Sequence, residues 1–258
     1  PLKGIFGSSW IGLKNFTRFF SSYMFPRLMK NTLGINLYNL ILGFPIPIIL
    51  AISLNYAVSK KFKKTVQMVT YAPHFISVVV LVGIILQLLS MRGLVNHFLG
   101  FFGIDAISFM GESSYFWTIY VLSNIWQHTG YGSIIYLAAL AGISPSLHEA
   151  AIVDGANKWQ RIWHVDLPGI RPTIIILLIL RTGRLMQLGF QKILLMQNPL
   201  NLSMSEVIQT YVYKIGIAGS TGNFSYPTAI GLFRSIINFI LIIAVNQIAK
   251  KVSDTSLW

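Results

Sequence analysis

The chain of 258 residues is 54% hydrophobic, only 10% of its residues are charged, and its formal net charge is +13. This composition excludes an ordinary soluble domain and indicates a polytopic membrane protein. The absence of cysteine excludes disulfides and thiolate metal sites. Because most basic residues lie near the ends of apolar runs, the positive charge indicates membrane orientation rather than nucleic-acid binding.

Residues 1–30 contain aromatic and basic residues but no apolar run long enough to span a membrane. We expect this segment to be extracytoplasmic or interfacial, with an amphipathic helix between Trp10 and Phe20. The chain begins at Pro1 rather than at a methionine. We therefore expect that an N-terminal piece, which includes a sixth membrane-spanning helix, is missing from it.

Five apolar runs follow, and we expect each to form one spanning helix of an all-α membrane bundle over residues 31–258. The runs cover residues 31–57, 69–90, 115–142, 171–198 and 228–249. Pro45 and Pro47 interrupt the first run and predict a kink. Four lysines within residues 60–64 predict a cytoplasmic loop. Alternation then places residues 91–114 and 199–227 outside the cell and residues 143–170 inside.

The polar insert at residues 143–170 separates two of these runs. Ser146 and Glu149 have the spacing of a capping box, which predicts a short helix that Gly155 stops after two turns. Such a helix is too short to span a membrane, so we expect a docking knob at its surface. One face of the helix would carry small and apolar residues: Leu147, Ala150 and Ala151.

A second short helix is predicted within the same insert. Asn157 with Gln160 repeats the start signal, and Trp159 and Trp163 fall at helical spacing. We expect this helix to end before Pro168, because proline disfavours helical geometry in the residue that precedes it.

Glu149-Ala150-Ala151 is followed after three residues by Gly155 and, nine residues later, by Val165-Asp166-Leu167-Pro168. This spacing resembles the EAA loop of permease subunits of binding-protein-dependent ABC importers, which has isoleucine where Val165 stands. The resemblance implies a cytoplasmic coupling helix that docks in a cleft of an ATP-hydrolysing subunit. It assigns coupling to Leu147, Glu149, Ala150, Ala151, Asp154 and Gly155. The alternative is an interfacial or re-entrant helix pair without an ATPase partner.

Polar side chains within the run at 171–198 predict a path for a solute. An arginine at bilayer depth costs roughly 2.5 to 3.5 kcal/mol on insertion scales, so it should face a bundle interior or a wet cavity. Residues spaced i, i+3, i+6 and i+10 would line one side of a helix: Arg181, Arg184, Gln187 and Gln191. In the alternative interpretation, the arginines bond backbone carbonyls or a neighbouring acid and only hold the bundle together.

Aromatic and amide residues in other runs are candidates for the same path. Aromatic faces beside amides suit the apolar and hydroxyl surfaces of a sugar ring. The candidates are Tyr120, Asn124 and Trp126 in the run at 115–142, beside Gln127, His128 and Tyr131, and Arg234 in the last run. The aromatic residues would instead form an interfacial belt in the alternative interpretation.

Residues 134–143, 211–214 and 231–234 are similar to permeases that import oligosaccharides and polysaccharide fragments. Members of that group often have an acidic residue after Gly-Phe in the fifth family span, whereas Gln191 and Lys192 follow Gly189-Phe190 here. The missing negative charge, with two arginines in the same run, leads to the hypothesis of an acidic, uronate-containing saccharide.

The resemblance implies a multi-pass permease subunit of the bacterial inner membrane that encloses half of a translocation path. Its implied partners are a second, related permease, two ATPase subunits, an extracytoplasmic solute-binding protein and membrane lipids, but no nucleic acid. ATP and Mg²⁺ are expected on the ATPase subunits, because this chain lacks a G-x-x-x-x-G-K-[ST] motif and should not be an enzyme by itself.

Metal binding and ion coupling are the remaining possibilities. The five histidines are scattered along the sequence without metal-ligand spacing, so we expect neither a metal nor another cofactor in this chain. The alternative function is an ion-coupled secondary transporter or channel. Such proteins usually need acids embedded in the membrane, and the predicted spans have almost none.

Overall fold

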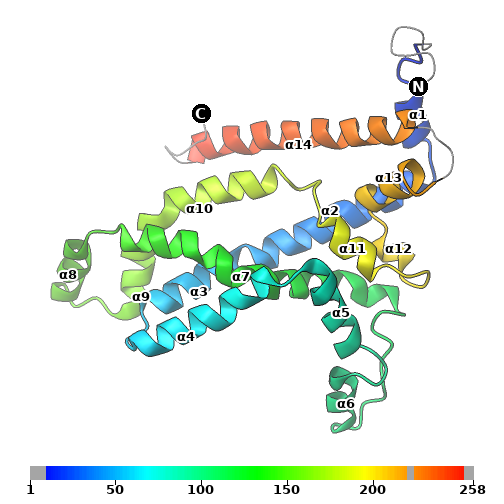
Figure 1. Cartoon of the computed structure of the whole chain (residues 1–258). Helices are drawn as coiled ribbons and strands as arrows, with labels where there is room; N and C mark the ends of the chain where they lie inside the picture. The colour runs from blue at the N-terminus through cyan, green and yellow to red at the C-terminus, as the bar shows by residue number, and fades with distance from the viewer. Residues whose placement is uncertain (1–9, 220–223, 253–258) are drawn as a thin grey trace.

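The computed structural model describes residues 10–219 and 224–252, and within these ranges the chain is helical and forms no strand (Figure 1). This confirms the predicted all-α fold. The longer helices are α2 (Met24–Gly43), α3 (Pro45–Asn55), α4 (Lys60–Tyr71), α5 (Val78–Leu88), α7 (Phe116–Ala141), α10 (Leu167–Thr182) and α14 (Ser225–Val252). The shorter ones are α1 (Lys14–Phe20), α6 (Leu94–Gly100), α8 (Pro145–Val153), α9 (Lys158–Arg161), α11 (Phe190–Met196), α12 (Leu202–Ser205) and α13 (Ile208–Gly216). Two 3-10 segments, η1 (Ala72–Phe75) and η2 (Ser113–Tyr115), and the π-helical segment η3 (Ile162–Asp166) complete the described elements.

Three helices in the described ranges are long and apolar enough to cross a membrane: Met24–Asn55, Lys158–Thr182 and Ser225–Lys251. Two more spans are possible if bent pairs count as one span each, namely α4 and η1 with α5, bent by 103°, and η2 and α7 with α8, bent by 71°. Apart from α5, the longer helices run roughly along one direction, with α8 and α9 at one end and α1, α12 and α13 at the other (Figure 1).

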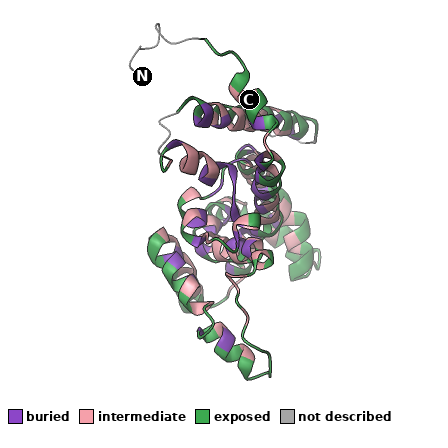
Figure 2. Cartoon of the chain, turned by 90° about the vertical axis from the view of Figure 1, so that its right-hand side faces the viewer, coloured by how far each residue is buried: buried purple, intermediate pink, exposed green. Residues whose placement is uncertain are grey.

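Buried residues gather where these helices meet, while the outlying helices are largely exposed (Figure 2). One apolar cluster joins α2, α5, α7 and α11, and another joins α3, α7 and α10. A third joins α1, α13 and α14 to the start of α2. Only 6% of the most apolar stretch of α14 is buried, so most of this helix is available to lipid or to another chain.

The first span begins earlier than the sequence indicates, at Met24 rather than at residue 31. Its first turns bury Met24 and Leu28 while Arg27 and Lys30 remain exposed. These two charges lower the local hydropathy, which is why the helix start was missed. The predicted helix between Trp10 and Phe20 is shorter than expected and forms α1.

The second run, residues 69–90, does not form the single straight span that was predicted. The chain turns after η1, where Pro73 is buried, and α5 starts anew with the Ser77 side chain accepting a bond from the Val80 amide at 3.3 Å. Hydropathy is insensitive to such a cap inside an apolar run. The lysine cluster also lies in the first turns of α4 rather than in a loop.

The fourth run, residues 171–198, is likewise two helices, because α10 ends at Thr182 and α11 begins at Phe190. Side chains from three other helices form hydrogen bonds with backbone groups of the stretch between α10 and α11. Tyr120 accepts from the Gly189 amide at 3.1 Å, Asn238 accepts from the Met186 amide at 3.0 Å, and Gln209 donates to the Met186 carbonyl at 2.8 Å. Irregular backbone is tolerated at membrane depth only with such partners or beside a wet cavity.

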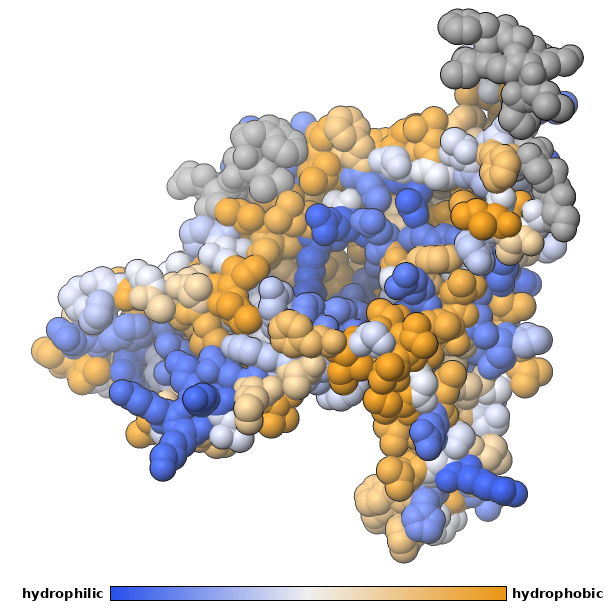
Figure 3. Space-filling model, in the orientation of Figure 1, coloured by the Kyte–Doolittle hydropathy of each residue, from blue (hydrophilic) through white to orange (hydrophobic). Residues whose placement is uncertain are grey.

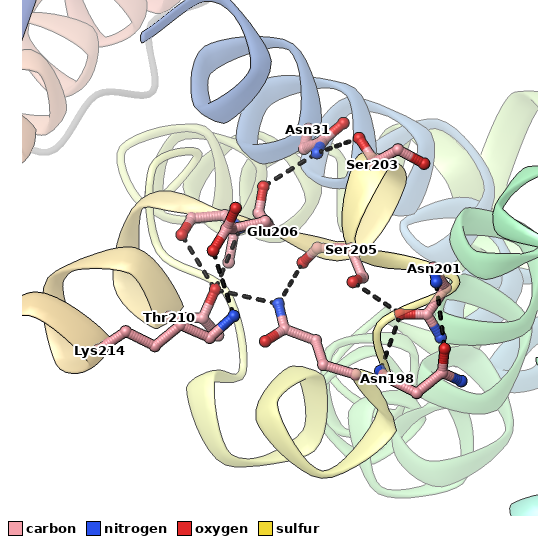
Figure 4. Close-up of polar contacts among 10 residues, drawn as sticks. Asn31, Asn198, Asn201, Ser203, Ser205, Glu206, Thr210 and Lys214 are labelled. Atoms are coloured by element: carbon pink, nitrogen blue, oxygen red, sulfur yellow. Dashed lines mark hydrogen bonds and ion pairs between the residues drawn. The ribbon is translucent and has the colours of Figure 1, made fainter. Parts of the chain in front are cut away.

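The chain between α11 and α13 is fixed by a network of buried amides and hydroxyls (Figure 4). Asn31 of α2 donates to the carbonyls of Ser203 and Glu206 at 3.0 and 2.9 Å. Ser205 donates to Asn201 at 2.9 Å, and the Glu206 carboxylate lies 3.1 Å from the Lys214 ammonium. These bonds join the segment that follows α11 to the first half of α2.

Candidate functional site

The coupling helix predicted in the polar insert is α8, although it starts differently from the prediction. Pro145 occupies the first turn and Ser144 is the N-cap, so the capping box of Ser146 and Glu149 does not form. The fixed φ of proline suits the first helical position and sets this start. Gly155 ends the helix as predicted, with φ of +77°. The Ala156 and Gly155 amides donate to the carbonyls of Ala151 and Ile152 at 2.8 and 3.0 Å, which is the Schellman arrangement.

The predicted coupling residues lie together on this exposed helix and its C-terminal turn. Glu149, Ala150, Asp154 and Gly155 are exposed, Leu147 is 55% exposed, and Ala151 is half-buried. The sequence analysis did not single out two apolar side chains of α8 that are also exposed, Ile152 at 55% and Val153 at 87%. Large apolar side chains exposed at a polar end of the molecule are typical of a surface that binds another protein.

The second predicted helix begins at a complete capping box, in which Asn157 and Gln160 bond each other's amides at 3.0 and 2.7 Å. The prediction that Pro168 ends it is wrong. The helix passes through the π-helical segment η3 and continues as α10, so that residues Lys158–Thr182 form one helix. A π-helical turn changes the hydrogen-bond register, which lets a helix accommodate a residue without an amide hydrogen.

An open cavity of about 600 Å³ lies between α2, α7 and the segment at 187–192. Figure 3 shows a hollow bordered by hydrophilic side chains near the middle of one face. The lining is mainly amide and aromatic: Asn36, Asn39, Val78, Tyr120, Asn124, Gln127, His128, Gln187, Leu188, Gly189, Phe190, Gln191 and Lys192. None of these described lining residues is acidic.

Half of the predicted path residues line this cavity, namely Tyr120, Asn124, Gln187 and Gln191. The others do not: Arg181, Arg184, Trp126 and Arg234. The predicted stripe on one helix does not exist, because the chain leaves helical geometry after Thr182.

Asn36 and Asn39 of α2 were missed by the sequence analysis, although two amides within an apolar run were a usable signal. Asn39 accepts a bond from the Asn124 amide at 2.9 Å, so the two sides of the cavity are bonded to each other. Trp126 is 49% exposed on α7, and Arg234 is half-buried on α14.

Lys192 is the cation of the cavity wall. The residue is only 4% exposed, its ammonium lies 3.4 Å from the Gln127 side-chain oxygen, and it is 5.6 Å from the centre of the Tyr120 ring. Both ion pairs within the described residues involve other groups. Lys192 therefore presents a positive charge to the cavity with an amide and an aromatic ring as its neighbours.

Arg181 bonds a backbone carbonyl, as the alternative interpretation of the arginines expected. Its guanidinium donates to the Gly43 carbonyl at 3.2 Å and lies 5.6 Å from the centre of the Phe44 ring. In a regular helix the amide of residue 47 would bond that carbonyl, but Pro47 has no amide hydrogen. Arg181 thus stabilises the junction of α2 and α3. Arg184 is exposed in the turn that follows α10.

Two of the histidines described as scattered come together in space. His74 of η1 and His128 of α7 have their Nδ1 atoms 3.2 Å apart, and the His74 ring stacks on Tyr131 at 4.0 Å. This contact attaches the bend between α4 and α5 to α7 beside the cavity. Within the described residues, no group of three or more histidine, aspartate or glutamate side chains is placed to hold a metal.

The family model for the inner membrane component of binding-protein-dependent transport systems matches residues 43–254. The chain belongs to this family. It is a membrane transport component, and membership sets aside the alternative of an ion-coupled secondary transporter or channel.

Two curated relatives of this family member come from Bacillus subtilis (strain 168). The polygalacturonan/rhamnogalacturonan transport system permease protein YteP is 41% identical over 259 residues, which cover 100% of this chain and 80% of the relative. Protein LplB is also 41% identical, with 100% of this chain and 81% of the relative covered.

The family member also resembles the solved structure of a bacterial ABC transporter involved in the import of the acidic polysaccharide alginate. The TM-score is 0.92 at 39% identity, covering 98% of this chain and 88% of that chain. A second structure, of the alginate transporter in complex with an alginate pentasaccharide-bound periplasmic protein, has the same TM-score and identity over 96% of this chain and 85% of that chain.

Proposed function

We propose that this chain is a permease subunit of an ABC importer in the bacterial inner membrane, and that it forms half of the path for an oligosaccharide that carries carboxylates. The observation that carries the proposal is the buried Lys192 in a cavity whose described lining is otherwise amide, aromatic and apolar. The names of YteP and of the alginate transporter, both of which concern acidic polysaccharides, support the substrate class.

The chemistry of the cavity suits such a substrate. Burying an ammonium without a partner costs several kcal/mol, so a carboxylate that entered the cavity would recover part of that cost. A charge-assisted hydrogen bond contributes roughly 1.5–3 kcal/mol net. The six amide side chains of the lining can bond hydroxyl groups, and Tyr120 can contact the apolar face of a sugar ring.

The open side of the cavity is where a second, related permease would complete the path. Two ATPase subunits would bind ATP and Mg²⁺, and one of them would receive α8, whose exposed apolar residues provide a surface for it. A solute-binding protein would deliver the saccharide from outside, since the second alginate transporter structure includes a periplasmic protein. Nucleotide-driven closure of the ATPases would then move the spans between inward and outward openings.

The orientation agrees with the positive-inside rule. The lysines at the start of α4 and at the end of α14 lie at the same end of the molecule as α8 (Figure 1). Cytoplasmic ends carry the excess of lysine and arginine. The coupling surface would therefore face the cytoplasm, where ATP is available.

The test compares two forms of one substrate in proteoliposomes that contain the full transporter and its solute-binding protein. Uptake of an oligogalacturonate is measured beside uptake of the same oligosaccharide with its carboxylates methyl-esterified. Lys192→Gln removes the charge and keeps a hydrogen-bonding group. We expect the apparent affinity for the acidic form to fall about tenfold or more, in line with the loss of one charge-assisted bond.

Lys30→Gln, on an exposed position of α2, is the matched control and should change neither uptake. Equal losses for the acidic and the esterified form in Lys192→Gln would refute charge recognition. Faster uptake of the esterified form by the unaltered transporter would refute the acidic substrate class.

A further inference from the structure

A buried carboxylate connects three elements at the α8 end of the molecule. Asp166 of η3 is 0% exposed. The hydroxyl of Tyr56, directly after α3, donates to its Oδ2 at 2.6 Å, and the Nε2 atom of His148 on α8 lies 3.4 Å from its Oδ1. Coupling helix, first span and the helix Lys158–Thr182 thus meet at one side chain.

The two oxygens of Asp166 differ in how well they are satisfied. Oδ2 has a short bond from Tyr56, whereas Oδ1 has no hydrogen-bond partner among the described residues. The contact with His148 at 3.4 Å is longer than the 2.7–3.2 Å typical of N–H···O bonds. Because a buried carboxylate is costly unless it is fully bonded, a shift of α8 towards η3 that shortens this contact is favourable.

The groups that surround the carboxylate keep this arrangement in place. Burial, and then the bond to Asp166, raise the pKa of the Tyr56 hydroxyl to about 12, so that it remains a donor at neutral pH. Arg161 lies over the Tyr56 ring at 5.7 Å. His164, on the same turn of helix as Asp166, is exposed and has its Nδ1 2.9 Å from the Gln160 carbonyl.

We propose that His148, Asp166 and Tyr56 are positioning residues that transmit movement of α8 to the first span, which borders the cavity, and to the helix Lys158–Thr182, which precedes the cavity segment at 187–192. The first span, Met24–Asn55, directly precedes Tyr56 and carries Asn36 and Asn39. The helix Lys158–Thr182 contains Asp166, and a short turn connects its end to the segment at 187–192. This inference rests on the proposed coupling role of α8. It adds the route by which a push on α8 reaches both sides of the cavity.

A purely stabilising role makes a different prediction from a transmitting one. Removing one partner of a buried bond is costly, but replacing both partners by apolar groups is often nearly neutral for stability. The double variant Tyr56→Phe, Asp166→Leu should therefore unfold close to the temperature of the unaltered protein, even though the connection to α8 is gone.

The experiment uses the full transporter in lipid nanodiscs and a reporter cysteine, Val78→Cys, in the cavity wall. Residues 1–258 contain no cysteine, so once any cysteine elsewhere in the subunit is replaced by serine, labelling of this subunit by a maleimide reports on the cavity alone. The labelling rate is measured with ATP and with ADP, together with ATP hydrolysis and thermal unfolding. In the unaltered protein we expect the two rates to differ at least threefold.

His148→Leu should bring the two labelling rates together while ATP hydrolysis and unfolding temperature are retained. His148→Gln, which keeps an N–H donor near the position of Nε2, should restore the difference. His97→Leu, on an exposed position of α6, is the matched control and should leave it unchanged. The double variant Tyr56→Phe, Asp166→Leu should unfold close to the temperature of the unaltered protein but should show no difference between its labelling rates with ATP and with ADP.

Two results would overturn the inference. One is a difference between the labelling rates with ATP and with ADP that persists in His148→Leu. The other is the same difference in a double variant that is as stable as the unaltered protein. If the unaltered transporter hydrolyses ATP but shows no difference in labelling, the proposed ATP-driven function fails, and this inference fails with it. The two failures are distinguishable because the second appears before any residue of the three is changed.

Discussion

Arg181 replaces the amide hydrogen that Pro47 lacks, and this relation can be tested with a double-mutant cycle. Arg181→Met removes the donor to the Gly43 carbonyl and keeps most of the apolar stem. A bond from a charged donor contributes roughly 1.5–3 kcal/mol. Because the Arg181 side chain is partly exposed, water can replace the lost donor, so we expect the lower end, about 1.5 kcal/mol or a tenfold change in the unfolding equilibrium.

Pro47→Ala is the second mutation of the cycle, since alanine restores an amide hydrogen that can bond the Gly43 carbonyl. In that background Arg181→Met should cost less than about 0.5 kcal/mol, which gives an interaction free energy of about 1 kcal/mol. The assay is unfolding by sodium dodecyl sulfate in mixed micelles, followed by circular dichroism. Arg184→Met, at the exposed position in the turn that follows α10, is the control for loss of charge. Equal costs of Arg181→Met in both backgrounds would refute the reasoning.

Four further variants test the packing and the coupling surface. Asn31→Ala removes two bonds to buried carbonyls and should destabilise the protein by about 2–3 kcal/mol in the same assay, whereas an effect below about 0.5 kcal/mol would contradict that network. Gly130→Ala would place its Cβ against the Thr70 carbonyl oxygen, so α4 must move away from α7 at a cost of about 1–3 kcal/mol, and a neutral result would show that this contact is looser. Glu149→Arg or Gly155→Arg should leave the subunit in the membrane but abolish substrate-stimulated ATP hydrolysis by the assembled transporter. Full stimulation after either change would exclude the coupling role of α8.

Local signals predicted the features that depend on a few neighbouring residues. Gly155 ends α8 and Asn157 with Gln160 starts the next helix, because both motifs are satisfied by backbone groups nearby. Two other predictions from local rules were wrong. The predicted capping box at Ser146 does not form, because Pro145 already occupies the first helical position. Pro168 does not end its helix, because the π-helical segment η3 changes the hydrogen-bond register before it.

The breaks within the second and fourth runs could not be found from hydropathy. The unwound stretch after Thr182 is stabilised by Tyr120, Asn238 and Gln209, which belong to three other helices. Because these partners are distant in the sequence, the local residues do not predict them. The same limit applies to the candidate site. The sequence indicated polar residues inside spans, but which of them share a cavity depends on how α2, α7 and the segment at 187–192 are packed.

The uninterrupted helix Lys158–Thr182 has a mechanical consequence. Twenty-five residues at 1.5 Å each make a rod about 37 Å long, so a tilt of about 5° displaces its far tip by about 3 Å. This displacement is roughly the diameter of a water molecule and is comparable to the donor–acceptor distance of a hydrogen bond. If α8 faces the cytoplasm as proposed, a modest rocking of this helix at its α8 end would move Thr182, and with it the chain that leads to the cavity segment at 187–192, far enough to make or break a hydrogen bond.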